Sequence, residues 1–234
     1  MKHLFALFVL LTVTAAAKDA ERPNIILVMA DDMGFSDIGC YGGEIQTPNL
    51  DRLAANGLRY TQFYNTARCC PTRASLLSGL YPHQAGVGWM MNDRGHPGYR
   101  GEINRECLTI AEALKSAGYG TYMAGKWHLG GAPELQPPSR GFEQSFYLVQ
   151  GGASHFSDQQ GLTETMVVDY LENGEVTALP SDFYSTTYYT DKMIGYIDQN
   201  RADGNPFFGY LAYTSPHWPL QVPTEDMDLY KMAM

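Results

Sequence analysis

An apolar run that starts at Asn24 and ends at Ala30, directly before Asp31-Asp32, constrains the fold more than any other feature. Its apolarity is continuous rather than alternating, which predicts a central parallel strand covered on both faces. A second apolar run, residues 207–213, leads into His217 in the same way. Each run therefore predicts a buried strand with polar side chains at its end.

Helix signals separate these runs. Residues 47–55 predict a helix capped by Thr47, and Gly57 follows its end. Residues 108–117 repeat this pattern and lead into a strand near residues 121–124, and a further helix is predicted before the second apolar run, at residues 188–199. Strands that alternate with helices predict an α/β fold, with a mostly parallel central sheet flanked by helices.

The longest segment without such signals, residues 131–182, is rich in Gly, Pro, Ser and Gln. We predict that it is an excursion over the side of the sheet where a ligand binds. The polar clusters of interest all follow predicted strands or open a helix. Open α/β sheets bind ligands at the carboxyl ends of their strands, so these clusters should meet there.

The chain has 234 residues and a formal net charge of −9 at pH 7. This charge argues against a non-specific nucleic-acid surface, but a local positive pocket for an anion can coexist with it. Residues 1–17 predict a signal peptide, and hence export to the periplasm or the medium. Their apolar stretch is shorter than the roughly 20 residues of a spanning helix, so no stable membrane span is expected.

Cys69 opens the sequence Cys-Cys-Pro-Thr-Arg, and a predicted helix follows that stops at Gly79. A helix N-terminus has unpaired N–H groups and a positive dipole end, so it receives anions, and the Arg73 guanidinium suits oxyanions. From its position alone, Cys69 is either an inert buried cysteine or a thiolate nucleophile. The spacing of the cysteines lacks the Cys-x-x-Cys zinc pattern, and a Cys40–Cys107 disulfide is possible.

The other clusters also have two interpretations each. Asp31 and Asp32 either bind a divalent cation, which relieves their mutual repulsion, or form a solvated turn. Lys126 and His128 lie two apart in a predicted extended segment, so both would point to one face. There they could hold an oxyanion and move a proton, or be a solvated lysine and a structural histidine. Prolines flank the His217-Trp218 pair and fix its direction.

These motifs together resemble the sulfatase family. Residues 69–73 match its signature Cys-x-Pro-x-Arg, and residues 76–83, 125–130 and 215–217 resemble further family elements in the same order. The resemblance extends to about Tyr230. It implies an alkaline-phosphatase-like fold, hydrolysis of sulfate monoesters, and a maturation enzyme that oxidises the signature cysteine to formylglycine. We expect His83 and His155 to be structural.

The resemblance also implies the role of each site residue. A gem-diol formed from the Cys69-derived aldehyde attacks sulfur in line with the leaving alcohol, and Arg73 supports the formylglycine. Lys126 and His217 bind the sulfate and stabilise the developing negative charge. His128 then helps to expel sulfate and restore the aldehyde.

One calcium ion is implied at this site, with Asp31, Asp32 and the Cys69-derived group as ligands. Calcium prefers hard oxygen ligands, which these residues supply. The rival interpretation is a zinc set of Asp31, Asp32, His128 and His217, as in phosphatases of the same fold.

Family members continue beyond the last residues of this sequence, and the resemblance implies that a later Asp-Asn pair completes their calcium site. We therefore expect residues 18–234 to be an incomplete N-terminal catalytic domain with weak metal affinity, little activity and a bare sheet edge. The expected partners are the maturation enzyme and a sulfated small molecule or glycan. Two alternatives stay open: a phosphodiesterase or phosphonate monoester hydrolase, and an inactive protein that binds sulfated ligands.

Overall fold

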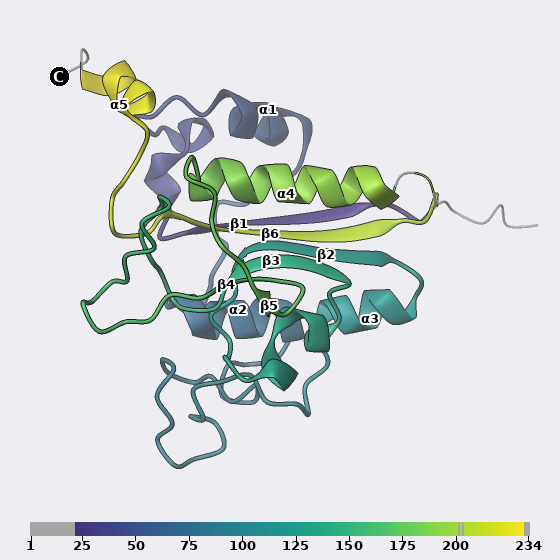
Figure 1. The fold of residues 1–234 in the computed structure, drawn as a ribbon. Coiled ribbons are helices and arrows are strands. Elements are labelled where there is room, and N and C mark those ends of the chain that lie inside the picture. Colours follow the sequence, from purple (N-terminus) through teal and green to yellow (C-terminus); the bar gives the residue numbers. More distant parts are fainter. Residues whose placement is uncertain (1–21, 201, 203, 232–234) are drawn as a thin grey trace, which may run out of the picture.

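The computed structural model describes residues 22–200, 202 and 204–231. A six-stranded sheet in the order β1-β6-β2-β3-β4-β5 forms the middle layer (Figure 1). Strands β1, β6, β2 and β3 run parallel, and β4 and β5 add an antiparallel edge. The predicted α/β fold with a mostly parallel sheet is confirmed. The strands are β1 (Ile25–Asp31), β2 (Gly120–Lys126), β3 (Gln144–Leu148), β4 (Tyr170–Glu172), β5 (Glu175–Val176) and β6 (Phe207–Pro216).

Helices cover both faces of the sheet (Figure 1): α4 lies on one face, and α2 and α3 lie on the other. Each face buries its own apolar cluster, one beneath α4 and one beneath α2 and α3. The α-helices are α1 (Pro48–Asn56), α2 (Cys69–Ser78), α3 (Ile110–Ser116), α4 (Ser185–Asn200) and α5 (Thr224–Lys231). Short 3-10 helices are η1 (Phe35–Asp37), η2 (Gly39–Tyr41), η3 (Pro133–Leu135) and η4 (Pro137–Arg140).

The three helices predicted from residues 47–55, 108–117 and 188–199 exist as α1, α3 and α4. Thr47 occupies the N-cap position of α1, as predicted, but the Thr47 hydroxyl makes no cap bond. It donates instead to Asp51 at 2.9 Å and accepts from the Gly39 N–H at 2.8 Å. These two bonds tie α1 to η2 rather than completing the helix end.

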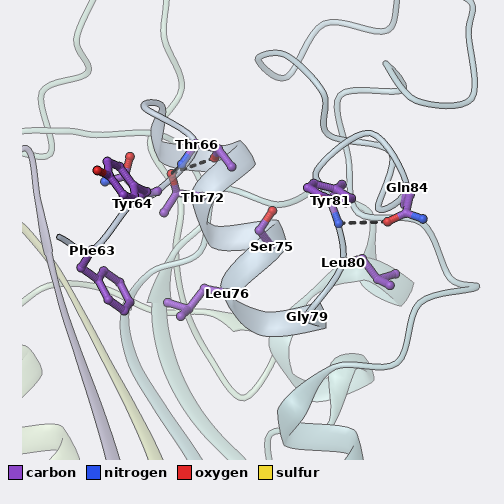
Figure 2. Close-up of a pocket in the computed structure, with 11 residues that line it drawn as sticks. Phe63, Tyr64, Thr66, Thr72, Ser75, Leu76, Gly79, Leu80, Tyr81 and Gln84 are labelled. Carbon is purple, nitrogen blue, oxygen red and sulfur yellow. Dashed lines mark hydrogen bonds between the residues drawn. The ribbon is translucent and has the colours of Figure 1, made fainter. Parts of the chain in front are cut away.

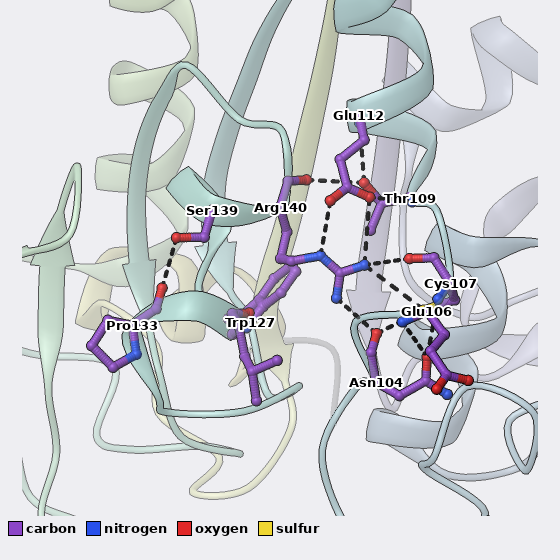
Figure 3. A network of polar contacts seen from close by, with 10 residues as sticks. Asn104, Glu106, Cys107, Thr109, Glu112, Trp127, Pro133, Ser139 and Arg140 are labelled. Atoms are coloured by element: carbon purple, nitrogen blue, oxygen red, sulfur yellow. Dashed lines mark hydrogen bonds and ion pairs between the residues drawn. The ribbon is translucent and has the colours of Figure 1, made fainter.

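Arg140 joins α3 to two irregular segments (Figure 3). Its Nε donates to the Glu112 carboxylate at 3.1 Å, and its other nitrogens donate to the carbonyl oxygens of Asn104 and Cys107 at 3.1 and 2.6 Å. Glu112 and Thr109 form a capping box at the start of α3. The buried guanidinium of Arg140, the last residue of η4, thus bonds acceptors both on α3 and in the segment before it.

The interpretation of residues 131–182 as a plain excursion is wrong in part, because they supply β3, β4 and β5. Strand β3 is buried beside β2, and its apolar part is only three residues long, Phe146-Tyr147-Leu148. So short a run, next to Gly- and Pro-rich sequence, gives little strand signal. Residues between β3 and β4 do form a long loop.

Strand β1 is parallel, as predicted, but it lies at the edge of the described sheet and not at its centre. Ile25, Leu27 and Met29 pack against the core beneath α2. Ile26 and Val28 point to the opposite face and are 54% and 56% exposed. This agrees with the expected bare sheet edge, and it means that the continuous apolar run is covered on one face only.

Two predictions concern the chain termini and membranes. The predicted signal peptide, residues 1–17, lies outside the described residues. Across the described part of the chain, no helix combines the length and apolarity needed to cross a bilayer.

All four cysteines are free, so Cys40 and Cys107 are not joined in this structure.

Candidate active site

The carboxyl ends of three adjacent parallel strands meet at one edge of the sheet. Asp31 at the end of β1 lies opposite Pro216 of β6, one residue before His217, and β2 ends at Lys126. Gly125 allows this convergence: its φ is +122°, and a Cβ there would lie 2.5 Å from the carbonyl carbon of Ala212 in β6. Only glycine fits so close an approach of two backbones.

A buried cluster of three charges lies at this edge. Lys126 Nζ donates to Asp31 Oδ2, and Arg73 Nη2 lies 3.5 Å from the same oxygen. Arg73 Nη1 also donates to the Lys126 carbonyl oxygen at 2.7 Å, which ties α2 to the end of β2. The three side chains are at most 4% exposed. Two cations against one carboxylate leave a net positive charge in a region shielded from water, which favours an anion there.

Cys69 begins α2 beside this cluster and is half-buried. A hydrogen bond from the Cys70 thiol, another from His128, and the positive charge of Lys126 together hold the pKa of Cys69 far below its ordinary value, although burial opposes them. The same thiol contact and burial raise the pKa of Cys70. One thiolate is thus stabilised at the helix N-terminus, which favours a reactive Cys69 over an inert one.

His128 reaches Cys69 by a route that the sequence did not indicate. Its φ is +55°, so the predicted extended segment ends at Trp127 and the argument from strand alternation fails at this residue. Burial lowers the pKa of His128 and keeps the imidazole neutral at pH 7, and its Nδ1 has no hydrogen-bond partner. A neutral buried imidazole next to a nucleophile is able to accept a proton.

Gly151 makes room for this imidazole. A Cβ at residue 151 would lie 2.6 Å from His128 Nε2, closer than real Cβ contacts. His128 and Gly151 also line a cavity of about 270 Å³, together with Met91, Gly130, Gly131, Val149, Gln150 and Met166. The loop after β3 therefore does pass over the site, as the sequence predicted for this region. Nothing in the sequence indicated that Gly151 in particular would face His128.

His217 follows β6 and faces Asp32: its Nε2 lies 3.7 Å from Asp32 Oδ2. Behind it, buried His155 bonds the His217 carbonyl oxygen through Nε2 at 3.1 Å and the Ser185 hydroxyl through Nδ1 at 2.8 Å. Since the carbonyl can only accept, Nε2 carries the proton and Nδ1 accepts from Ser185. His155 thus fixes the backbone of the His217 loop, in agreement with its expected structural role. His83 contacts the Tyr99 hydroxyl.

Lys126 is influenced by its surroundings in two opposing ways. Burial and the charge of Arg73 lower the pKa of Lys126, whereas Asp31 and the Cys69 thiolate raise it. The nearby negative groups therefore determine whether the ammonium stays charged. An incoming anion would add to them and favour the charged form.

The expected calcium ligands agree with calcium in kind but are few. Asp31 and Asp32 supply hard carboxylate oxygens, but Asp31 Oδ2 already bonds Lys126 and contacts Arg73. Calcium takes about six to eight oxygens, more than these two residues offer. Among the described residues, the only group of three or more acidic, histidine or cysteine ligands is Cys69, Cys70 and His128. The rival zinc set with both aspartates and both histidines is therefore not gathered.

A larger cavity lies on the opposite face of α2 (Figure 2). Its volume is about 530 Å³, and its lining includes Thr72, Ser75 and Leu76 of α2 together with Phe63, Tyr64 and Tyr81. None of the predicted site residues lines it. Helical spacing explains this, because Arg73 and Cys70 lie on the face that is turned toward the sheet.

Comparison with known proteins decides the family. The family model described as Sulfatase matches residues 23–231. The chain belongs to the sulfatase family. Arylsulfatase from Klebsiella aerogenes is 43% identical over 222 residues, which are 93% of this chain and 48% of the relative.

Two solved structures share the fold. Ps i-CgsB aligns with a TM-score of 0.80 at 33% identity and covers 90% of this chain and 49% of its own. BT4656, solved in complex with its substrate D-glucosamine-2-N,6-O-disulfate, aligns with a TM-score of 0.73 at 30% identity and covers 91% of this chain and 38% of its own. The chain thus spans half or less of the length of these relatives.

Proposed function

We propose that this chain is the N-terminal catalytic part of a sulfuric ester hydrolase that uses a formylglycine made from Cys69. The observation that carries the proposal is the buried Arg73–Asp31–Lys126 cluster beside the first residue of α2. Its net positive charge and the helix N-terminus both favour a sulfate ester over a neutral substrate. Membership of the sulfatase family supports the same reaction.

The residues around Cys69 would divide the work as follows. Lys126 and His217 bind sulfate oxygens and stabilise the charge that develops on them, while Arg73 holds α2 against the end of β2. His128, neutral at pH 7, takes a proton from the Cys69-derived group. These are the roles that the family resemblance implies, and two observations support them: Lys126 and His128 interact with Cys69, and His217 lies beside Asp32.

Asp31, Asp32 and the Cys69-derived group would hold a calcium ion. When bound, calcium would supply positive charge that polarises the ester and stabilises negative charge. The described residues offer only two carboxylates for it, so we propose that this chain alone binds calcium weakly and turns over slowly.

The substrate class we propose is a sulfated sugar or small aryl sulfate. BT4656, a relative with the same fold, was solved with a sulfated glucosamine as its substrate. Export to the periplasm or the medium is proposed from residues 1–17, and it would expose the protein to sulfate esters outside the cytoplasm. The maturation enzyme is the second partner that the proposal requires.

Sulfate binding tests the proposal without requiring turnover. Isothermal titration of p-nitrophenyl sulfate into the purified chain should show one site, and Lys126→Met should weaken it by at least tenfold through loss of a buried charge. Lys115→Met, at an exposed ion pair with Glu143, is the matched control and should bind like the unaltered chain. Equal affinity in Lys126→Met would contradict the proposed anion pocket.

A kinetic assay tests the second part. With the maturation enzyme co-expressed and millimolar calcium added, we expect little release of p-nitrophenol from the chain alone. Fusion of the chain to the C-terminal half of Klebsiella aerogenes arylsulfatase should raise the rate. Cys69→Ala in this fusion should abolish the release of p-nitrophenol. Turnover at ordinary enzymatic rates by the chain alone would contradict the expected weak calcium site.

A further inference from the structure

We propose that the chain with an unconverted Cys69 binds one thiophilic metal ion, of the Zn²⁺ or Cd²⁺ type, through Cys69, Cys70 and His128. This site shares residue 69 with the proposed calcium site, but its other two ligands and its metal are different. It requires only the thiol form of the chain, so it does not depend on sulfate hydrolysis.

The ligand atoms already lie close together. The two sulfur atoms and one imidazole nitrogen are all within 4.8 Å of one another. Two sulfurs on a tetrahedral zinc ion, with bonds of about 2.3 Å, are separated by about 3.8 Å. Small rotations of the side chains are therefore enough to close the set around an ion, and the backbone of α2 need not move.

His128 is suited to ligation because its bonding is incomplete. The side chain is buried, and its Nδ1 has no hydrogen-bond partner. The hydrogen bond between His128 and Cys69 is the contact that an ion would replace, so the ring can then present an unprotonated nitrogen to it. In the proposed site a water molecule would complete the tetrahedral set as the fourth ligand.

The Cys70 thiol contacts two side-by-side residues, Trp89 and Met90. Its sulfur lies 3.7 Å from the Met90 thioether and 3.5 Å from the carbonyl oxygen of Trp89. These contacts hold the Cys70 side chain on the side of α2 that faces the site. Cys69 is already the thiolate, so ligation releases only the proton of the Cys70 thiol to solvent.

The nearby charges determine which ions bind. Lys126 and Arg73 repel any cation, and one carboxylate, Asp31, offsets them in part. A hard ion such as Ca²⁺ or Mg²⁺ gains little from sulfur, so it would not bind to this set of two thiolates and an imidazole. Ions that form strong bonds to thiolate would, which predicts selectivity for zinc and cadmium. Conversion of Cys69 to an aldehyde removes one sulfur and should abolish the site.

Cadmium titration of the full 234-residue chain, made in a host without a maturation enzyme, tests this inference. In a Cys40→Ser/Cys107→Ser background we expect one ion per chain and the ultraviolet charge-transfer band of two thiolates. Cys70→Ser, which keeps the size of the side chain, should reduce the band to that of one thiolate and weaken binding by at least 100-fold. His128→Gln should keep both thiolates but weaken binding by at least tenfold.

Three further measurements serve as controls. Far-ultraviolet circular dichroism establishes that each variant is folded, and a thousandfold excess of Ca²⁺ should leave the cadmium band unchanged. Cobalt should give the visible spectrum of a tetrahedral ion in the background chain. An unchanged band in Cys70→Ser, or equally tight binding after Cys69→Ser, would overturn the proposed site.

Discussion

The reactivity of Cys69 depends on side chains from two elements. Cys70 belongs to the same helix, whereas Lys126 ends β2 and His128 follows two residues later. Hydrogen bonding from Cys70 and His128 and the charge of Lys126 lower the pKa of Cys69 from 9.0, so its thiolate should persist at pH values where free cysteine is protonated. The two cysteines share a single proton between them.

We predict that iodoacetamide labels Cys69 of the unconverted chain at pH 6, and that the rate hardly changes between pH 5 and 8. The thiolate is the reactive form, and the lowered pKa keeps it populated throughout this range. Cys107, buried near Arg140, should stay unlabelled as an internal control. A labelling rate that rises tenfold per pH unit would show that Cys69 has an ordinary pKa.

Gly151 gives a second test at the level of single residues. In Gly151→Ala the new Cβ would collide with the His128 ring, and we expect a loss of about 1–3 kcal/mol in the free energy of unfolding from overpacking. The matched control is Gly131→Ala beside the same cavity, whose Cβ would meet only Val149 at 3.7 Å. Urea unfolding measures both. Equal stabilities for the two variants would mean that His128 does not pack on residue 151.

At the level of elements, Arg140 determines how α3 and the segment before it pack. We predict that Arg140→Met lowers the free energy of unfolding by about 2–3 kcal/mol, because buried acceptors lose charge-assisted hydrogen bonds. Lys115→Met, on α3, is the control: it removes only an exposed ion pair with Glu143 and should lower the free energy of unfolding by less than about 1 kcal/mol. Urea unfolding again measures both, and a cost below 1 kcal/mol for Arg140→Met would refute this account of α3.

The elements differ in how well the sequence predicts them. Strands β1, β2 and β6 and helices α1–α4 carry local signals, namely long apolar runs, caps and terminal glycines, and these predictions hold. Because parallel strands end at one edge, the meeting of Asp31, Lys126 and His217 was also predictable. Strands β3–β5 were not, since their short runs gain strand conformation only from pairing in the sheet.

Within the site, the sequence failed where tertiary contacts decide. The left-handed backbone of His128 and the contact of Gly151 with its ring have no local signal. Cys70 interacts with Cys69, and its adjacency at the helix start is the one indication of this in the sequence. The sequence predicted β1 as a central strand covered on both faces. A continuous apolar run shows neither how many neighbours a strand has nor which of its faces are covered.

At the level of the whole molecule, we predict that the edge strand β1 promotes self-association, because its Ile26 and Val28 are exposed. Val28→Lys should reduce self-association, because a charge at an exposed edge opposes pairing with another chain. Val176→Lys is the matched control: it is 77% exposed on β5 at the other side of the sheet. Light scattering at increasing protein concentration measures the self-association of both variants. An equal reduction in the two would show that self-association does not occur through β1.

Mass spectrometry of a peptide that spans Cys69 tests the central claim most directly. The chain is produced together with a sulfatase maturation enzyme, and Klebsiella aerogenes arylsulfatase in the same host is the positive control. We predict that Cys69 has lost its sulfur and two hydrogens and gained an oxygen, as an aldehyde that a hydrazide traps, while Cys70 remains a thiol. An unchanged Cys69 alongside a converted control would contradict the account.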